Sequence, residues 1–218
     1  MNEIRYDSKI EDVDFNLPTV FLAGPTVRGN QPNLISWRFE AIKLFQSKLF
    51  HGNLIVPEFI SKTESDKYRY DIPVWEFNGL SKCHVIMFWV PRTKELIGLT
   101  TNHEHGYWMA RDRKKVVYGR PDLAYRITYL DIMWIEDSKR SGAPCPIYNT
   151  LEKTVDAALE RFSPWGIIDI KSDYEETLEI AKSKGWLLIG HKNEELYWWN
   201  GTIKKEIDWN KSLREQLP

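Results

Sequence analysis

Four short apolar runs, each followed along the chain by a longer stretch with helical spacing, constrain the fold of this sequence more than any other feature. The runs occupy residues 19–23, 53–57, 84–90 and 115–118. The stretches with apolar residues at helical spacing are 33–50, 72–81, 102–111 and 150–162. Short apolar runs that alternate with amphipathic helices predict a parallel sheet with helices on both faces. A further apolar segment, 129–135, fits either a last strand or a helix.

Composition places the chain among globular proteins. Of its 218 residues, 42% are apolar and 13% aromatic, which is ample for a packed core and excludes a disordered chain. The formal net charge of −1 argues against a broad surface for nucleic acid polymers or anionic membranes. No apolar run reaches membrane-spanning length and the polar N-terminus lacks a signal-peptide core, so we expect a soluble, cytoplasmic protein.

The cysteines and histidines do not predict a metal site. Cys83 and Cys145 are far apart in unlike settings, which gives neither a disulfide framework nor a metal quartet. His103 and His105 flank Glu104, but neighbouring helical residues point apart, and the pattern is not the i, i+4 histidine pair of a zinc protease. We therefore expect no metal and no cofactor.

The stretch 99–111 carries the candidate nucleophile. It follows the apolar run 84–90 at the carboxyl edge of the predicted sheet, where open α/β folds place their ligands. Asn102 is a good N-cap, which would put Glu104 in the first turn of the helix. The helix dipole would then keep Glu104 ionised and available as a nucleophile or base. The alternative is that Glu104 only complements the dipole.

The loop at 24–32, between the first predicted strand and its helix, is a candidate ligand loop. It carries Gly24, Thr26 and Arg28. Glycines and helix N–H groups at such a junction can hold an anion or a hydroxyl, and the Arg28 guanidinium suits bidentate contact with a phosphate. The loop has neither a Walker pattern nor the three-glycine dinucleotide pattern. A tight structural turn, with Arg28 in a surface ion pair, is the alternative.

Domain organisation follows from a break at Ser163-Pro-Trp-Gly. Residues 1–162 are expected to form the main domain, in which residues 1–17 are a charged, irregular lead-in. Residues 163–218 are expected to form a small extension, with a helix at 172–184, strands at 185–189, 196–199 and 202–207, and a hairpin at Asn200-Gly201. A piece of this size is marginal for independent folding, so we expect it to dock on the main domain or on a partner subunit.

Eight motifs in a fixed order carry a resemblance to a known family. They are Phe21-Leu-Ala-Gly-Pro-Thr-Val-Arg28, Trp37-Arg38, Val56-Pro-Glu58, Trp75-Glu76, Phe88-Trp-Val-Pro-Arg92, Thr100-Thr-Asn-His-Glu-His-Gly106, Val116-Val-Tyr-Gly-Arg-Pro121 and Tyr129-Leu-Asp131. Over residues 18–162 the chain resembles the nucleoside 2-deoxyribosyltransferase-like family. The resemblance implies a flavodoxin-like fold and cleavage of the N-glycosidic bond of a 2′-deoxynucleoside or its 5′-monophosphate. The tail from 163 onward has no counterpart in it.

The same resemblance implies roles for two acidic residues. The family's nucleophile is a Glu in a Thr-x-x-Glu-x-Gly setting, which is matched by Glu104. An acidic residue on the helix before the third strand assists near the base, and its match is Glu76. The sequence departs from the transferases where they carry Asp, at His84 and at Gly98. The departure at Gly98 puts base selection and recognition of the 5′-hydroxyl in doubt.

These residues predict a double displacement with two outcomes. Glu104 would attack C1′ as the base leaves, and Glu76, its pKa raised by Trp75 and a nearby like charge, would protonate the base. Attack by a second base on the resulting ester gives transfer, which is the preferred prediction. Attack by water gives a 5′-monophosphate N-glycosidase, an alternative favoured by Arg28 and Gly98. A non-catalytic nucleotide-sensing module is a further alternative.

The remaining candidate contacts each have two interpretations. Trp75 either stacks on a nucleobase or belongs to the core, and Arg92 either binds phosphate or forms a surface ion pair. Asn102 either orients the sugar or only caps the helix. The expected partners are a nucleoside or nucleotide and a free base. The resemblance also implies a homo-oligomer, in which residues 125–134 can supply residues to a neighbouring subunit's site.

Overall fold

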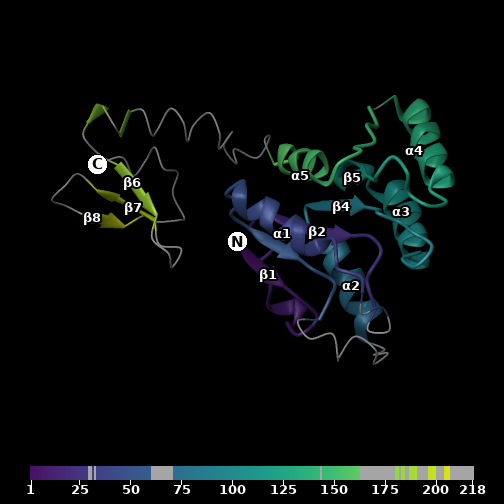
Figure 1. Cartoon of the computed structure of the whole chain (residues 1–218), viewed down its shortest axis with the longest axis horizontal. Coiled ribbons are helices and arrows are strands. Elements are labelled where there is room, and N and C mark those ends of the chain that lie inside the picture. Colours follow the sequence, from purple (N-terminus) through teal and green to yellow (C-terminus); the bar gives the residue numbers. More distant parts are fainter. Residues whose placement is uncertain are drawn as a thin grey trace. The chain divides into compact units, whose positions relative to one another are not determined.

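The computed structural model describes residues 1–28, 31, 33–59, 71–142, 144–162, 180–181, 183–184, 187–190, 196–199 and 204–206. The chain divides into two compact units, Met1–Arg161 and Phe162–Pro218 (Figure 1). Both units contain a sheet, and each is described by itself.

The first unit is built on a five-stranded sheet in which all neighbouring strands are parallel. In spatial order the strands are β1 (Asn2–Ile4), β3 (Asn53–Ile55), β2 (Thr19–Ala23), β4 (Val85–Trp89) and β5 (Val116–Gly119). Every residue of the four strands after β1 is buried, which is why these strands are continuous apolar runs in the sequence. The predicted α/β fold with a flavodoxin-like parallel sheet is confirmed.

Helices cover both faces of this sheet. They are α1 (Arg38–Ser47), α2 (Asp71–Lys82), α3 (Leu99–Arg111), α4 (Thr128–Ser141) and α5 (Leu151–Glu160). Helix α5 lies on β4 and β5 and contacts α1 (Figure 1). On the other face, residues of α2, α3 and α4 pack with the strand residues Phe21, Ile86 and Phe88 in one core cluster. The site described below lies on this second face.

The N-terminal segment is an ordered part of the sheet, so the predicted irregular lead-in at 1–17 is wrong. Strand β1 pairs with β3 and forms an edge of the sheet, and a 3-10 helix, η1 (Ile10–Asp12), follows it. Ile10 is 1% exposed and belongs to the core cluster. A three-residue strand with two exposed polar residues has no apolar period, which is why the sequence pattern missed it.

Several predicted boundaries need correction. Helix α1 begins at Arg38 and not at residue 33, and the Ser36 hydroxyl accepts a hydrogen bond from the Arg38 N–H at this start. The segment 129–135 is helical and forms part of α4, which ends at Ser141 and is capped by Gly142 with φ 69°. Helix α5 was predicted over 150–162 and runs from Leu151 to Glu160, with Thr150 as its N-cap, whose hydroxyl accepts a hydrogen bond from the Lys153 N–H.

The strand order places a topological switch point at the carboxyl edge of the sheet, between β2 and β4, which is the position where open α/β folds form a ligand crevice. The chain passes from β2 outward to β3, and then from β3 back across β2 to β4, so the connections after β2 and β4 lead away in opposite directions. The loops that follow these two strands approach closely. A Cβ built on Gly98 would lie 2.8 Å from the Pro25 side chain, and one on Gly24 would lie 2.1 Å from the Trp89 carbonyl oxygen.

The second unit contains a three-stranded antiparallel sheet. Its order is β6 (Leu187–Gly190), β7 (Leu196–Trp199) and β8 (Lys204–Glu206). These strands agree with the predicted runs 185–189, 196–199 and 202–207. The predicted turn at 200–201 and most of the predicted helix at 172–184 lie outside the described residues. Among the described helices of the chain, none has the length and apolar character needed to cross a membrane.

Candidate functional site

Two acidic side chains on neighbouring helices are close enough to influence each other electrostatically. Glu76 is the sixth residue of α2, and Glu104 is the sixth residue of α3. The two helices pack together through Phe77, whose ring centroid lies 6.2 Å from that of Trp108 and 6.1 Å from that of Tyr107. Each helix therefore contributes one carboxyl group to the site, from the corresponding turn.

Glu104 is half-buried, and its pKa is raised to about 7. Burial is the main cause, the negative charge of Glu76 adds to it, and the positive charge of Arg38 opposes it. The prediction that a first-turn position and the helix dipole keep Glu104 ionised is wrong. Helix α3 begins at Leu99 with Gly98 as its N-cap, at φ 61°, so Glu104 lies in the second turn.

Glu76 is held differently. Burial raises its pKa, while a hydrogen bond from the Tyr6 hydroxyl and the charges of Arg38 and Arg28 act in the opposite direction. The direction of the shift agrees with the prediction, but the like charge that was expected to raise it acts on Glu104 instead. Two carboxyl groups with separate surroundings are the arrangement that acid–base chemistry requires.

Arg38 lies behind the pair and organises the first loop. Its guanidinium is 1% exposed, lies 2.9 Å from the Glu58 carboxylate, and donates to the carbonyls of Leu22 and Gly24 at 3.0 and 2.9 Å. Longer bonds of 3.3 Å reach the Pro25 carbonyl and the Thr26 hydroxyl. Sequence reasoning assigned no role to Tyr6, Arg38 or Glu58, although Trp37-Arg38 and Val56-Pro-Glu58 are among the family motifs. A charged residue between apolar neighbours was the available signal for Arg38.

The three candidate residues of the first loop are all at the crevice. Gly24 has φ 148° and leaves no room for a side chain against β4. Thr26 is tied to Arg38, and Arg28 is exposed and close enough to the carboxyl pair to lower the pKa of Glu76. Within the described part of the chain, Arg28 forms no ion pair. Its guanidinium therefore has no carboxylate partner among the described residues and lies near Glu76.

Trp75, Arg92 and Asn102 are engaged with the protein itself. The Trp75 ring is 9% exposed and its indole N–H donates to the Ser8 carbonyl, which favours the packing interpretation. Arg92 is 4% exposed, so the surface ion pair is wrong. Its guanidinium donates to the Asn102 side-chain oxygen at 2.7 Å, so these two candidates bind each other. Asn102 lies inside α3, and its predicted role as the N-cap is wrong.

The histidines beside Glu104 point apart as expected. His103 is exposed, whereas His105 is 2% exposed among Phe88, Tyr118 and Trp134, where burial lowers its pKa to about 4. His84 accepts a hydrogen bond from the Thr19 N–H at 3.1 Å. Over the part of the chain that the structure describes, no group of three or more His, Cys, Asp or Glu side chains is arranged to hold a metal ion.

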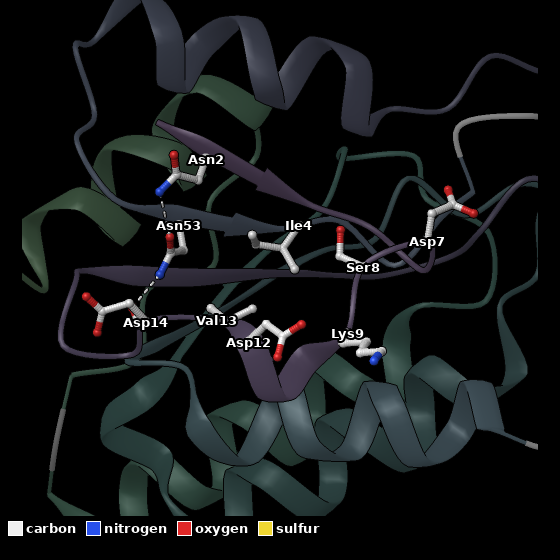
Figure 2. Close-up of a pocket in the computed structure, with 9 residues that line it drawn as sticks. All are labelled: Asn2, Ile4, Asp7, Ser8, Lys9, Asp12, Val13, Asp14 and Asn53. Carbon is white, nitrogen blue, oxygen red and sulfur yellow. Dashed lines mark hydrogen bonds between the residues drawn. The ribbon is translucent and has the colours of Figure 1, made fainter.

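Two hollows of about 510 Å³ each lie away from the carboxyl pair. One lies beside β1 and the segment that follows it, and its lining is rich in aspartate (Figure 2). The lining residues are Asn2, Ile4, Asp7, Ser8, Lys9, Asp12, Val13, Asp14 and Asn53. The other lies between α3 and α4 and includes Asn102 and His105. Neither is lined by Glu76 or Glu104.

Comparison of the chain with models of known protein families gives no match, and a search of curated proteins finds none either. The geometry of the carboxyl pair and the motifs that surround it are therefore the features that bear on function.

Proposed function

We propose that this protein cleaves the N-glycosidic bond of 2′-deoxynucleosides or deoxynucleotides and transfers the sugar to another base. The observation that carries the proposal is the pair of half-buried carboxyl groups, Glu76 and Glu104, beside the topological switch point of a parallel sheet. Two carboxyl groups in different surroundings are what a retaining glycosidic displacement uses. The resemblance of residues 18–162 to the nucleoside 2-deoxyribosyltransferase-like family supports the same reaction.

In this mechanism Glu104 attacks C1′ of the sugar while the base departs. A covalent deoxyribosyl ester forms on Glu104, and Glu76 gives a proton to the leaving base. When a second base enters, Glu76 takes the proton from its attacking nitrogen and the ester is displaced. The resulting nucleoside keeps the configuration at C1′, because two inversions have taken place. The reaction needs no metal or organic cofactor.

Hydrolysis is the second candidate, and Arg28 is the observation that favours it. The Arg28 guanidinium is exposed at the mouth of the site without an ion-pair partner among the described residues, and it lies near Glu76. A guanidinium in this position suits the 5′-phosphate of a deoxynucleotide. Gly98 stands where the transferases carry an Asp, and it has no side chain that could bind a 5′-hydroxyl. Water in place of the acceptor base then makes the enzyme a deoxynucleoside 5′-monophosphate N-glycosidase.

The deciding experiment is chromatography of the purified protein with a panel of deoxynucleosides and their 5′-monophosphates, each with and without a second free base. A new nucleoside that appears only when the acceptor base is added supports transfer. Free base released without an acceptor, chiefly from monophosphates, supports hydrolysis and the role of Arg28. Arg28→Gln is the matched variant. It should lower kcat/KM for monophosphate substrates and leave kcat/KM for nucleosides unchanged.

A non-catalytic nucleotide sensor is the outcome that would overturn both reactions. Glu104→Ala should abolish turnover of any active substrate and leave ligand binding, measured by calorimetry, largely intact. Absence of turnover across the whole panel, with a ligand that binds the wild-type protein, would favour the sensor.

A further inference from the structure

Tyr6 reaches the carboxyl pair from the segment that follows the edge strand β1. Its hydroxyl donates a hydrogen bond to a carboxylate oxygen of Glu76. Its ring is held from two sides, with centroids 4.9 Å from that of Phe59 and 5.0 Å from that of Trp75. Burial and the charge of Glu76 raise the pKa of Tyr6 well above its ordinary value, so the hydroxyl keeps its proton and remains a donor.

The charged and polar groups around the two carboxyls are distributed unequally. Glu76 receives the Tyr6 hydroxyl and is influenced by two cations, Arg28 from the loop after β2 and Arg38 from α1. Glu104 is influenced by Arg38 and by the negative charge of Glu76. Among the described residues, no side chain donates a hydrogen bond to Glu104. A donor and an additional cation favour the charged form of a carboxyl group, so the surroundings favour ionisation of Glu76.

We propose that Tyr6 is a positioning residue that holds Glu76 as the ionised member of the pair and leaves the pair's single proton on Glu104 in the free protein. Its hydroxyl selects Glu76 because the ring is fixed between Phe59 and Trp75. Glu104 is near the negative charge of Glu76 and receives no side-chain hydrogen bond from the described residues. It therefore binds the remaining proton more tightly than Glu76 does.

The role of this proton in turnover rests on the proposed function. As the glycosidic bond breaks, the proton passes from Glu104 to Glu76 and from Glu76 to the departing base. The Glu104 carboxyl loses one proton and gains a bond to C1′, the base gains that proton, and Glu76 ends ionised as it began. The proton that prevents Glu104 from acting as a nucleophile is thus the one that the leaving base needs, and no outside acid takes part.

The experiment is a carboxyl titration of the free protein, full-length and without substrate, by NMR with ¹³C-labelled glutamate. Glu76→Gln and Glu104→Gln assign the two resonances. In the wild-type protein Glu76 should ionise at a lower pH than Glu104. In Tyr6→Phe, which keeps both ring contacts, the Glu76 midpoint should rise by about one pH unit or more, because a hydrogen bond to a charged group is lost. The Glu104 midpoint should fall, since Glu76 is then neutral over a wider range.

A matched control is Tyr118→Phe. The Tyr118 hydroxyl donates to Asp131 at 2.8 Å, so this variant also removes a tyrosine–carboxylate hydrogen bond from the same unit. It should leave both glutamate midpoints unchanged. The proposal is overturned if Glu76 in the wild-type protein holds its proton to a higher pH than Glu104, a result that requires no variant to fold. It is also overturned if Tyr6→Phe moves neither midpoint.

The titration uses no substrate, so its result is independent of the proposed reaction. If the substrate panel shows turnover, the pH profile of kcat/KM gives a second readout. A pair that works with one proton gives a bell-shaped profile, and Tyr6→Phe should narrow that bell by moving its acid limb to higher pH, while the alkaline limb, which is set by loss of the pair's last proton, does not fall. An absence of turnover together with the expected midpoints would reject the reaction and retain the role of Tyr6.

Discussion

The guanidinium of Arg38 lies 2.9 Å from the carboxylate of Glu58, and the two side chains are only 1% and 11% exposed. Because Arg38 also donates to the carbonyls of Leu22 and Gly24, this ion pair joins α1 to the end of β2 and to the loop after β3. The pair is therefore the structural support for the first loop of the candidate site.

Removal of one member of this pair should be strongly destabilising. Arg38→Met leaves Glu58 without its cation and three carbonyls with fewer donors, so the free energy of unfolding should fall by about 3–5 kcal/mol. Glu40→Gln, on the same helix, removes a carboxylate from the exposed pair with Lys43 at 3.8 Å and should change it by less than about 1 kcal/mol. Urea unfolding of both variants measures the difference. If both variants change the free energy of unfolding by the same small amount, the Arg38–Glu58 pair does not support the first loop.

The raised pKa of Glu104 predicts a particular dependence of stability on pH. The folded protein keeps the Glu104 proton up to a pH of about 7, whereas the unfolded chain releases it near the ordinary value of 4.5. The folded state binds more protons in this window, so stability is greatest below it and falls as the pH rises through it, by at most about 3 kcal/mol. Glu104→Gln removes this loss.

The measurement is a series of urea unfolding curves between pH 4 and 8, where the bounds are set by roughly the two pKa values. The stability of Glu104→Gln relative to the wild-type protein should grow with pH across the window. Glu40→Gln, at an exposed position, should run parallel to the wild-type protein. A Glu104→Gln curve that also runs parallel would contradict the raised pKa.

Two glycines should respond oppositely to substitution by alanine. At Gly24, with φ 148°, a Cβ would lie 2.1 Å from the Trp89 carbonyl oxygen, so Gly24→Ala should cost about 3 kcal/mol or more and disturb the crevice. At Gly106, inside α3, a Cβ meets nothing within 4 Å. Gly106→Ala should therefore raise stability by up to about 1 kcal/mol. Thermal unfolding distinguishes the two, and a tolerated Gly24→Ala would mean that the loop can move away from β4.

The sequence predicts the buried strands of the sheet but not its exposed edge strand. Buried parallel strands are continuous apolar runs, so β2 to β5 and the fold class follow from the pattern. The edge strand β1 is short and largely exposed, and nothing in its composition marks it. Tyr6 was missed for that reason. Its contact with Glu76 spans 70 positions, and only the topology brings the two together.

The start of α3 shows a second limit. Asn102 is a good N-cap by residue type, yet the structure uses Gly98, whose left-handed backbone turns the chain beside Pro25. Asn102 instead accepts a hydrogen bond from the buried Arg92, a tertiary contact that residue preferences do not contain. This shift of one turn moves Glu104 out of the first turn of α3, and burial together with the charge of Glu76 raises its pKa, which is why its predicted ionisation was wrong.

The Arg92–Asn102 bond gives a prediction that separates structural support from substrate binding. Asn102→Asp places a carboxylate 2.7 Å from a buried guanidinium and near the start of α3, so stability should rise by about 1–2 kcal/mol. Asn102→Leu removes the acceptor and should lower stability by a similar amount. If Asn102 only supports Arg92, the Asp variant keeps the wild-type KM. A raised KM in a well-folded Asp variant would instead indicate that Asn102 contacts the substrate.

The family resemblance implicates residues 125–134 in contacts between subunits. We therefore expect an oligomer that dissociates when one charged residue is introduced into this segment. Tyr129 is 71% exposed and Ile132 is 50% exposed, on a helix that lies beside the one carrying Glu104. Apolar side chains exposed together on one helix are typical of a subunit interface. Sedimentation of the full-length protein should give a multiple of the chain mass, and Ile132→Glu should lower it. Ile35→Glu, at a position outside α4 that is 82% exposed, is the control and should leave the mass unchanged. If the wild-type protein is monomeric and catalyses the reaction, the site around the carboxyl pair is complete within one chain.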